Sequence, residues 1–110
     1  MDYILAIDGG SSKTEFALAT LDGEIIRSVV IEKGTNPWKH RDFADVEAII
    51  REGVEQLAID GSVVSCVAGI SGCHGDSQYA PAFKQILTPY LQENAKLFIT
   101  GDVLSSFNAL

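Results

Sequence analysis

Hydrophobic and polar residues follow two different periods along this 110-residue chain. Short apolar runs bounded by turn residues predict strands, whereas apolar positions three or four residues apart predict helices. Strand-like runs occupy residues 3–7, 16–21, 24–32, 63–70 and 96–100. Helix-like spacing occupies residues 43–59, 80–91 and 103–110. The predicted order is three strands, followed by helix, strand, helix, strand and helix.

Turn and capping residues support this order. Asp22-Gly23 predicts a type I′ hairpin turn, so the first three strands are expected to be antiparallel. Asp42 is placed to cap the first helix, and Pro89 is expected to kink or end the second helix early. The nearly continuous apolar run at 63–70 is typical of a strand buried on both faces. The sequence therefore predicts an α/β fold with a five-stranded mixed sheet, whose parallel strands are joined by helical crossovers.

Composition and charge narrow the class of protein. Hydrophobic residues make up 46% of the chain, which is enough for a folded core. A net charge of −7 argues against nonspecific binding to nucleic acid or to an anionic membrane. Two cysteines, Cys66 and Cys73, are too few for a disulfide framework and are expected to be reduced. With no apolar membrane span or signal segment recognised, a cytoplasmic location is expected.

The turn between the first two strands is the most informative segment. Its sequence is Asp8-Gly9-Gly10-Ser11-Ser12-Lys13-Thr14. The glycines let a ligand approach the backbone, the hydroxyl groups and successive amides can bind an anion, and Lys13 adds positive charge. Asp8 can hold a cation directly or through water. A metal-bound polyphosphate fits this set, and the alternative is an ordinary Gly-Ser hairpin, since the Walker A spacing is absent.

A second polar segment, Gly34-Thr35-Asn36-Pro37-Trp38, follows the third strand. The Asn36 amide and the flat face of Trp38 suit the hydroxyl edges and apolar faces of a sugar ring. The alternative is that Trp38 packs into the core. His40, just beyond this segment, is expected to be a solvated loop histidine.

Two more polar segments follow the last two strands. The first is the segment 69–76, whose small residues keep a cleft open and expose backbone amides. Its Cys73, His74 and Asp76 are a poor match to the ligand spacing of a zinc site. Asp102, after the strand at 96–100, is placed to take a proton from an attacking hydroxyl group. The alternative is that Asp102 only caps the helix predicted to start at Val103, and the two roles are compatible.

Together these segments resemble a known family. Residues 8–15 resemble the first phosphate motif of the acetate and sugar kinase, Hsp70 and actin superfamily. Thr35-Asn36-Pro37-Trp38, Ile70-Ser71-Gly72 and residues 100–106 follow in the order seen in N-acetylglucosamine kinases of the BadF/BadG/BcrA/BcrD ATPase family. The resemblance covers the whole chain. It implies a ribonuclease H-like fold, ATP with Mg²⁺, and phosphoryl transfer to a hydroxyl group of an amino sugar.

The resemblance also implies a role for each site residue. Asp102 would be the general base, and Asp8 would help to place the metal. The residues implied to face the phosphates are Gly9, Gly10, Ser11, Ser12, Lys13 and Thr14. The residues implied to line the sugar site are Asn36, Trp38, Ser71 and Gly72.

We expect residues 1–110 to be the N-terminal lobe of a longer protein. The second phosphate motif and the adenosine-binding segment would belong to a second lobe, so the isolated lobe is expected to be inactive. Expected partners are an amino sugar, ATP, the second lobe and a second copy in a homodimer, but no nucleic acid and no membrane.

Two other functions stay open at this point. One is an ATPase activator lobe of a 2-hydroxyacyl-CoA dehydratase or benzoyl-CoA reductase type system. The other is a noncatalytic module, either sugar-sensing or actin-like. The loop with Asn36 and Trp38 argues against the activator, which has no sugar to hold.

Overall fold

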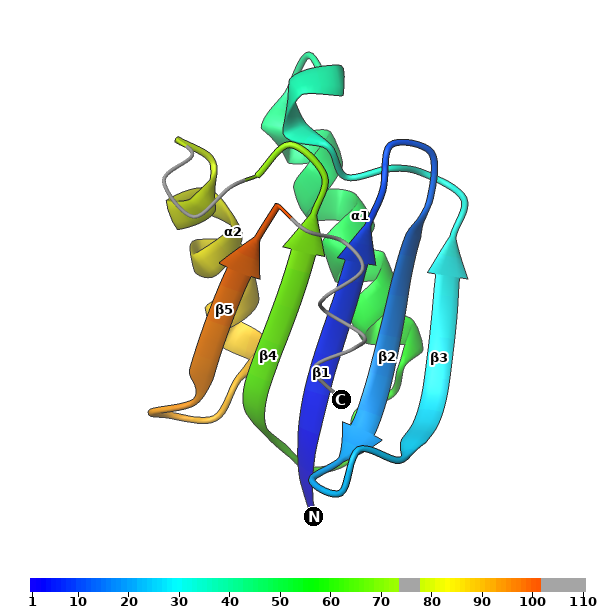
Figure 1. Cartoon of the computed structure of the whole chain (residues 1–110), viewed down its shortest axis with the longest axis vertical. Helices are drawn as coiled ribbons and strands as arrows, with labels where there is room; N and C mark the ends of the chain where they lie inside the picture. The colour runs from blue at the N-terminus through cyan, green and yellow to red at the C-terminus, as the bar shows by residue number, and fades with distance from the viewer. Residues whose placement is uncertain (74–77, 102–110) are drawn as a thin grey trace.

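The computed structural model describes residues 1–73 and 78–101. These residues form one five-stranded sheet in the order β3-β2-β1-β4-β5 (Figure 1). The strands are β1 (Asp2–Gly9), β2 (Thr14–Thr20), β3 (Ile25–Ile31), β4 (Ser62–Ile70) and β5 (Lys96–Thr100). The helices are α1 (Phe43–Gln56) and α2 (Ala80–Leu87), with short 3₁₀ turns η1 (Pro37–Lys39) and η2 (Thr88–Tyr90).

Strand pairing confirms the predicted mixed sheet. Strands β1, β2 and β3 pair in antiparallel fashion, while β1 pairs with β4 and β4 with β5 in parallel. The carboxyl ends of β1, β4 and β5 therefore meet at one edge of the sheet. The helix predicted at 103–110 lies outside the described residues.

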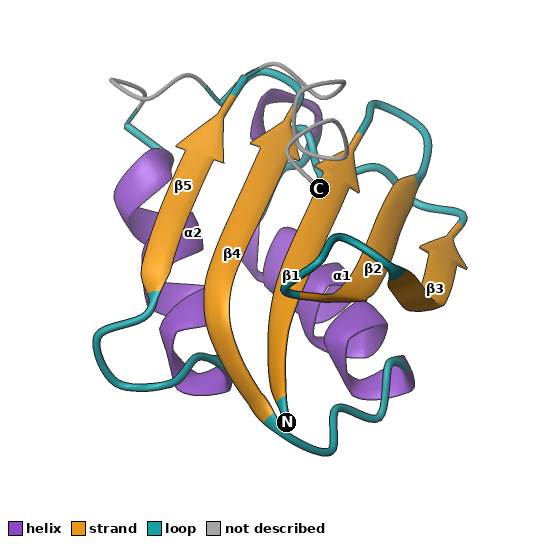
Figure 2. Ribbon diagram, turned by 60° about the horizontal axis from the view of Figure 1, so that its bottom comes forward, coloured by secondary structure: helices purple, strands orange, loops and turns teal. Residues whose placement is uncertain are grey.

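The core lies between the sheet and its two helices. Figure 2 shows α1 and α2 on the same side of the sheet. Fully buried core residues include Leu5, Ile7, Phe16, Leu18, Val46, Ile50 and Phe83. Gly53 brings α1 close to the sheet, because a Cβ atom there would lie 2.0 Å from the Phe16 ring.

The hairpin turn between β2 and β3 differs from the prediction. A type I′ turn needs a positive φ at both central residues. Gly23 has a positive φ of 89°, but Asp22 does not. The Gly23 amide donates to the Thr20 carbonyl at 2.9 Å, and the Thr20 amide donates to the Glu24 carbonyl at 2.9 Å. This pattern is typical of a three-residue hairpin with glycine in the left-handed position, so the predicted type I′ turn is wrong.

The predicted helix boundaries are largely confirmed. The Asp42 carboxylate caps α1 by accepting from the Ala44 amide at 2.9 Å. The helix ends at Gln56, earlier than predicted, and Ala58 follows with a φ of 50° that a right-handed helix cannot contain. Helix α2 ends at Leu87, two residues before Pro89. Proline has no amide proton to donate within a helix, so the helix ends early, as predicted.

Both cysteines are buried, and they form no disulfide with each other, as predicted. Cys66 lies within β4, and its burial raises the pKa of the thiol to about 12. The thiol is therefore unreactive in the folded protein at neutral pH. In the described part of the chain neither helix has the length and apolar character that a membrane span requires.

Candidate functional site

Three polar segments meet beyond the carboxyl ends of β1 and β4. They are the β1–β2 turn (residues 10–13), the segment from 32 to 40 that contains η1, and residues 71–73 after β4. The Thr35 amide donates to the Gly10 carbonyl at 3.1 Å, and the Ser71 amide donates to the Gly9 carbonyl at 2.7 Å. Backbone hydrogen bonds thus join segments that are far apart in the sequence. Residues predicted separately as phosphate and sugar ligands therefore belong to one loop cluster.

The β1–β2 turn presents its polar residues to solvent. The Gly10 amide donates to the Lys13 carbonyl at 2.9 Å, which closes the turn. The side chains of Ser11, Ser12 and Lys13 are exposed. Lys13 pairs with Glu15 at 3.2 Å, and both side chains keep contact with water. An exposed pair of this kind is weak, so an anionic ligand can replace Glu15 as the partner of Lys13.

Glycines allow the loops of the site to approach closely. A Cβ atom on Gly9 would lie 2.1 Å from Thr35 Oγ1. A Cβ atom on Gly34 would lie 2.2 Å from the Ser11 carbonyl oxygen. Gly34 begins the polar segment predicted after the third strand, but the sequence predicts no role in the site for this glycine itself. The one feature of the sequence that could have indicated this close approach is a glycine directly before Thr35-Asn36-Pro37.

Thr14, the first residue of β2, is buried beneath the loop cluster. Its side chain has no exposed surface, and its hydroxyl group donates to the Lys33 carbonyl at 2.9 Å. The Thr35 hydroxyl lies 3.2 Å away and is also fully buried. Thr14 therefore fixes the loop after β3 and does not face the open side of the turn, where phosphates were predicted to bind. The sequence could not distinguish this hydroxyl from those of Ser11 and Ser12.

Asp8 is the second-last residue of β1 and lies near two other charged residues. It lies opposite Glu15 in the β1–β2 register. Partial burial raises the pKa of Asp8, the Glu15 carboxylate raises it further, and Lys13 opposes both effects. The ionised carboxylate is therefore held at a cost in stability, which is a common property of functional sites.

The residues near Asp8 fit Mg²⁺ only with further ligands. A carboxylate and hydroxyl oxygens are the donors that Mg²⁺ prefers, and it usually keeps several waters and phosphate oxygens. Within residues 1–73 and 78–101, no group of three or more His, Cys, Asp and Glu side chains is placed to hold a metal. Asp8 therefore suits a metal that arrives with a polyphosphate.

Replacing Asp8 with asparagine is expected to raise the melting temperature at pH 7. The folded-state pKa of Asp8 lies above the unfolded value of about 3.9, so ionisation destabilises the fold as the pH rises through the folded pKa. Below the unfolded pKa, Asp8 is protonated in both the folded and the unfolded state. The increase in melting temperature caused by Asp8→Asn should therefore vanish there. Thermal unfolding at pH 7 and pH 3 measures this difference. Asp22→Asn, in the exposed hairpin turn, controls for loss of a negative charge, and an equal gain at both pH values would contradict the assignment.

Trp38 is held at the surface by contacts to two other segments. Its side chain is 62% exposed, so the alternative that it packs into the core is wrong. The indole Nε1 donates to the Gly72 carbonyl at 2.9 Å, and the ring meets Tyr79 edge-on at 5.0 Å. The Asn36 side-chain oxygen accepts from the Trp38 amide at 3.0 Å and caps η1. The exposed indole face is therefore fixed in position before any ligand binds.

Gly72 is required both by its conformation and by its surroundings. Its φ of +82° lies in the left-handed region that favours glycine. A Cβ atom there would lie 2.6 Å from the Asn36 side-chain oxygen and 2.9 Å from Trp38 Cδ1. The residues predicted to line the sugar site, Ser71 and Gly72 with Asn36 and Trp38, are thus neighbours. The predicted residues His74, Asp76 and Asp102 lie outside the described residues.

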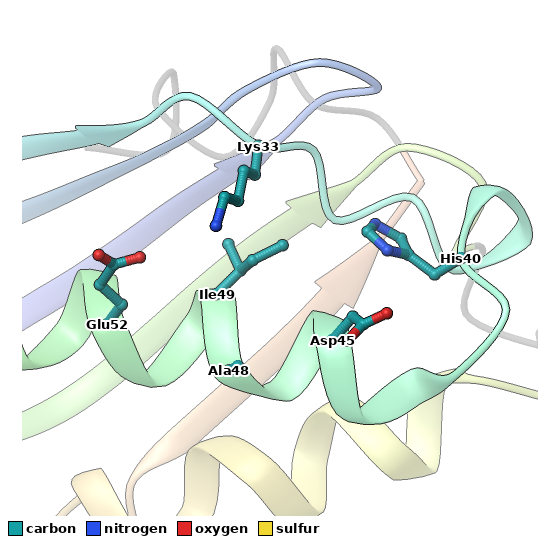
Figure 3. Close-up of a pocket in the computed structure, with 6 residues that line it drawn as sticks. All are labelled: Lys33, His40, Asp45, Ala48, Ile49 and Glu52. Atoms are coloured by element: carbon teal, nitrogen blue, oxygen red, sulfur yellow. The ribbon is translucent and has the colours of Figure 1, made fainter.

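His40 is half-buried and not solvated as predicted. One ring nitrogen, Nε2, lies 2.8 Å from the Gly34 carbonyl oxygen, so the two ends of the loop that carries Asn36 and Trp38 are joined. Beside this contact, a groove of about 330 Å³ separates the loop from α1 (Figure 3). Its lining residues are Lys33, His40, Asp45, Ala48, Ile49 and Glu52. This groove lies behind the loop and contains none of the predicted site residues.

The sheet order and the loop cluster at its carboxyl edge define an α/β fold of the ribonuclease H-like type. The chain is similar to the ligand-bound xylulose kinase from Lactobacillus acidophilus, with a TM-score of 0.50 and 21% sequence identity. The match covers 64% of this chain and 16% of the kinase chain. No family model and no curated protein matches the sequence. The similarity confirms the predicted fold.

Proposed function

We propose that this chain is the N-terminal lobe of a sugar kinase that transfers phosphate from ATP to a hydroxyl group of an amino sugar such as N-acetylglucosamine. The observation that carries the proposal is the contact between a polar glycine-serine turn and a loop with an exposed, fixed tryptophan. One element suits phosphates and the other suits a sugar. Phosphoryl transfer requires that the two substrates lie side by side.

The phosphate side of the proposed site is the β1–β2 turn. Exposed Ser11 and Ser12 offer hydroxyl groups, and Lys13 offers a positive charge once it leaves Glu15. Asp8 is the proposed partner of Mg²⁺, directly or through water. The bound metal would neutralise charge on the transferred phosphoryl group. Catalysis would otherwise depend on alignment, because this reaction needs little covalent chemistry from the protein.

The sugar side of the proposed site is formed by η1 and the segment after β4. The exposed face of Trp38 suits the apolar C–H face of a sugar ring, and Asn36 and Ser71 offer polar groups at its edge. The resemblance to N-acetylglucosamine kinases in these segments supports an amino sugar. The structural similarity to a xylulose kinase is consistent with the broader class of sugar kinases.

Asp102 is the proposed general base, since it follows the carboxyl end of β5 in the sequence. A second lobe would supply the adenosine site and close over the substrates. This chain alone is therefore proposed to bind sugar weakly and to catalyse little or no transfer.

Sugar binding is expected to change the fluorescence of Trp38. This residue is the only tryptophan of the chain, so the emission reports on the proposed site alone. Titration with N-acetylglucosamine should shift the emission of the chain in a saturable way, because a stacked sugar excludes water from the indole. Sorbitol, which has no ring, should give no saturable shift. Ser12→Ala, in the phosphate turn, should leave the sugar response unchanged.

ATP turnover separates the proposed function from the alternatives. In a protein that joins this lobe to a nucleotide-binding lobe, ADP should form only when an amino sugar is present. ADP formation that is indifferent to every sugar would contradict the kinase proposal. A saturable Trp38 response without any ADP formation would leave a sugar-sensing module as the better account.

A further inference from the structure

Strand β3 forms an edge of the sheet that is unusually open and apolar. In the described part of the chain its only strand neighbour is β2, and Figure 1 shows it at the end of the sheet. Six of its 7 residues retain partial or full exposure. Four of the large exposed hydrophobic side chains lie on β3 or in the turn before it: Leu21, Ile25, Ile26 and Val30. Edge strands with such exposed apolar side chains readily pair with another chain.

The usual features that protect an edge strand are weak in β3. The strand contains no proline and no lysine, and its only charged residue is Arg27. Arg27 is bound to Asp60 at 3.4 Å, so its charge is partly neutralised within the same molecule. A register irregularity affects β3 only near its start, at residues 25–27, and residues 27–31 pair regularly with β2. By contrast, the opposite edge strand β5 has 5 residues and begins with Lys96.

The sequence of β3 is complementary to itself in antiparallel pairing. The strand reads Ile-Ile-Arg-Ser-Val-Val-Ile, with Ser28 at its centre. Pairing about Ser28 places Arg27 opposite Val29 in the second copy and, at the register irregularity near the start of the strand, Ile26 opposite Val30. The apolar residues Ile26 and Val30 then meet, each Arg27 faces a Val29, and the two arginines do not face each other. Cross-strand pairs of this kind stabilise a sheet.

We propose that two copies of this chain associate through their β3 strands, so that two five-stranded sheets join into one sheet about a two-fold axis at Ser28. The interface is isologous, because each strand supplies the same residues to the other. Strand β3 runs in the same direction as β1. Because the two β3 strands pair in antiparallel fashion, the loop clusters of the two copies lie at opposite ends of the strands of the combined sheet. Association therefore leaves both clusters open, and the proposal does not depend on the proposed sugar kinase activity.

Two substitutions at the proposed axis give a sharp test. Ser28 is exposed, so Ser28→Lys and Ser28→Glu should fold normally, which far-ultraviolet circular dichroism checks. Each variant alone places like charges opposite each other across the axis and should weaken the dimer by about fivefold or more. An equal mixture of the two variants should recover the dimer, since lysine then faces glutamate. Analytical ultracentrifugation over a range of concentrations measures the dissociation constant, with a monomer mass of 11.8 kDa.

Phe98→Lys is the matched control on the other edge strand. Phe98 is 58% exposed in β5, so this substitution adds the same charge at an exposed position on the other edge strand and should leave the dimer intact. A wild-type chain that stays at the monomer mass up to about 1 mM would overturn the proposal. A dimer that survives both Ser28 variants and is lost in Phe98→Lys would also overturn it, because association would then use β5 or the sheet face.

Discussion

Replacing Gly34 with alanine is expected to separate the two loops of the candidate site and to destabilise the fold. The new Cβ atom would lie 2.2 Å from the Ser11 carbonyl oxygen and 2.6 Å from the Gly10 carbonyl oxygen. These are backbone atoms of a closed turn and cannot rotate away as a side chain can. Overpacking of this kind costs about 1–3 kcal/mol. The movement also lengthens the hydrogen bond from the Thr35 amide to the Gly10 carbonyl.

Thermal unfolding of Gly34→Ala and Gly10→Ala provides a matched comparison. A Cβ atom on Gly10 would lie 3.2 Å from the Lys13 carbonyl oxygen, which needs a shift of only a few tenths of an ångström. Neither glycine has a positive φ, so the comparison isolates steric contact from backbone strain. Gly34→Ala should melt several degrees lower than Gly10→Ala and should lose the saturable Trp38 response. Equal melting temperatures would show that the two loops do not depend on this contact.

Asp102→Asn is expected to have the largest effect on activity, on the basis of the proposed function. An attacking sugar hydroxyl must lose its proton, and a carboxamide cannot accept it as a carboxylate does. The expected loss in kcat is about 10²–10⁴-fold, with little change in KM for the sugar. The readout is sugar-dependent ADP formation by a protein that carries this lobe together with a nucleotide-binding lobe.

The control for this variant is Asp2→Asn, which removes one exposed carboxylate at the start of β1. It changes the net charge equally and lies at the end of the strand away from the loop cluster, so its kcat should match the wild type. If Asp102→Asn retains more than about a tenth of the wild-type kcat, Asp102 is not the base. Its role would then be the alternative that the sequence allows, which is to cap the segment after it.

The sheet could be predicted from the sequence because its signals are local. Apolar runs and turn residues lie within the segments that they define, and proline marked the end of α2 at Leu87. The failures arose where backbone dihedral angles decided the outcome. Asp22-Gly23 is compatible with two hairpin types, and the residue pair alone does not determine which one twists correctly between β2 and β3. The early end of α1 depends on the left-handed conformation of Ala58, a residue that carries no such signal in the sequence.

The candidate site was less predictable because it depends on contacts between distant segments. The sequence placed Ser11, Ser12 and Lys13 in a polar turn, and the structure leaves them exposed there. It treated Thr14 as one more hydroxyl group of that turn, although the pleat of β2 directs this side chain into a buried contact with Thr35. The bonds from Trp38 to Gly72 and from His40 to Gly34 join residues whose closeness only the fold establishes.

The order of strands in the sheet also determines how the chain can fold. Strands β1, β2 and β3 are neighbours in both sequence and space, so they can pair as soon as they are made. Strand β1 must wait for its other partner, because Gly9 lies opposite Ile70 in the β1–β4 register. Contacts between such distant residues slow folding, since a long loop must close before they form. During synthesis, one side of β1 therefore stays unpaired until β4 has left the ribosome, and this is the interval in which the chain is most exposed to aggregation.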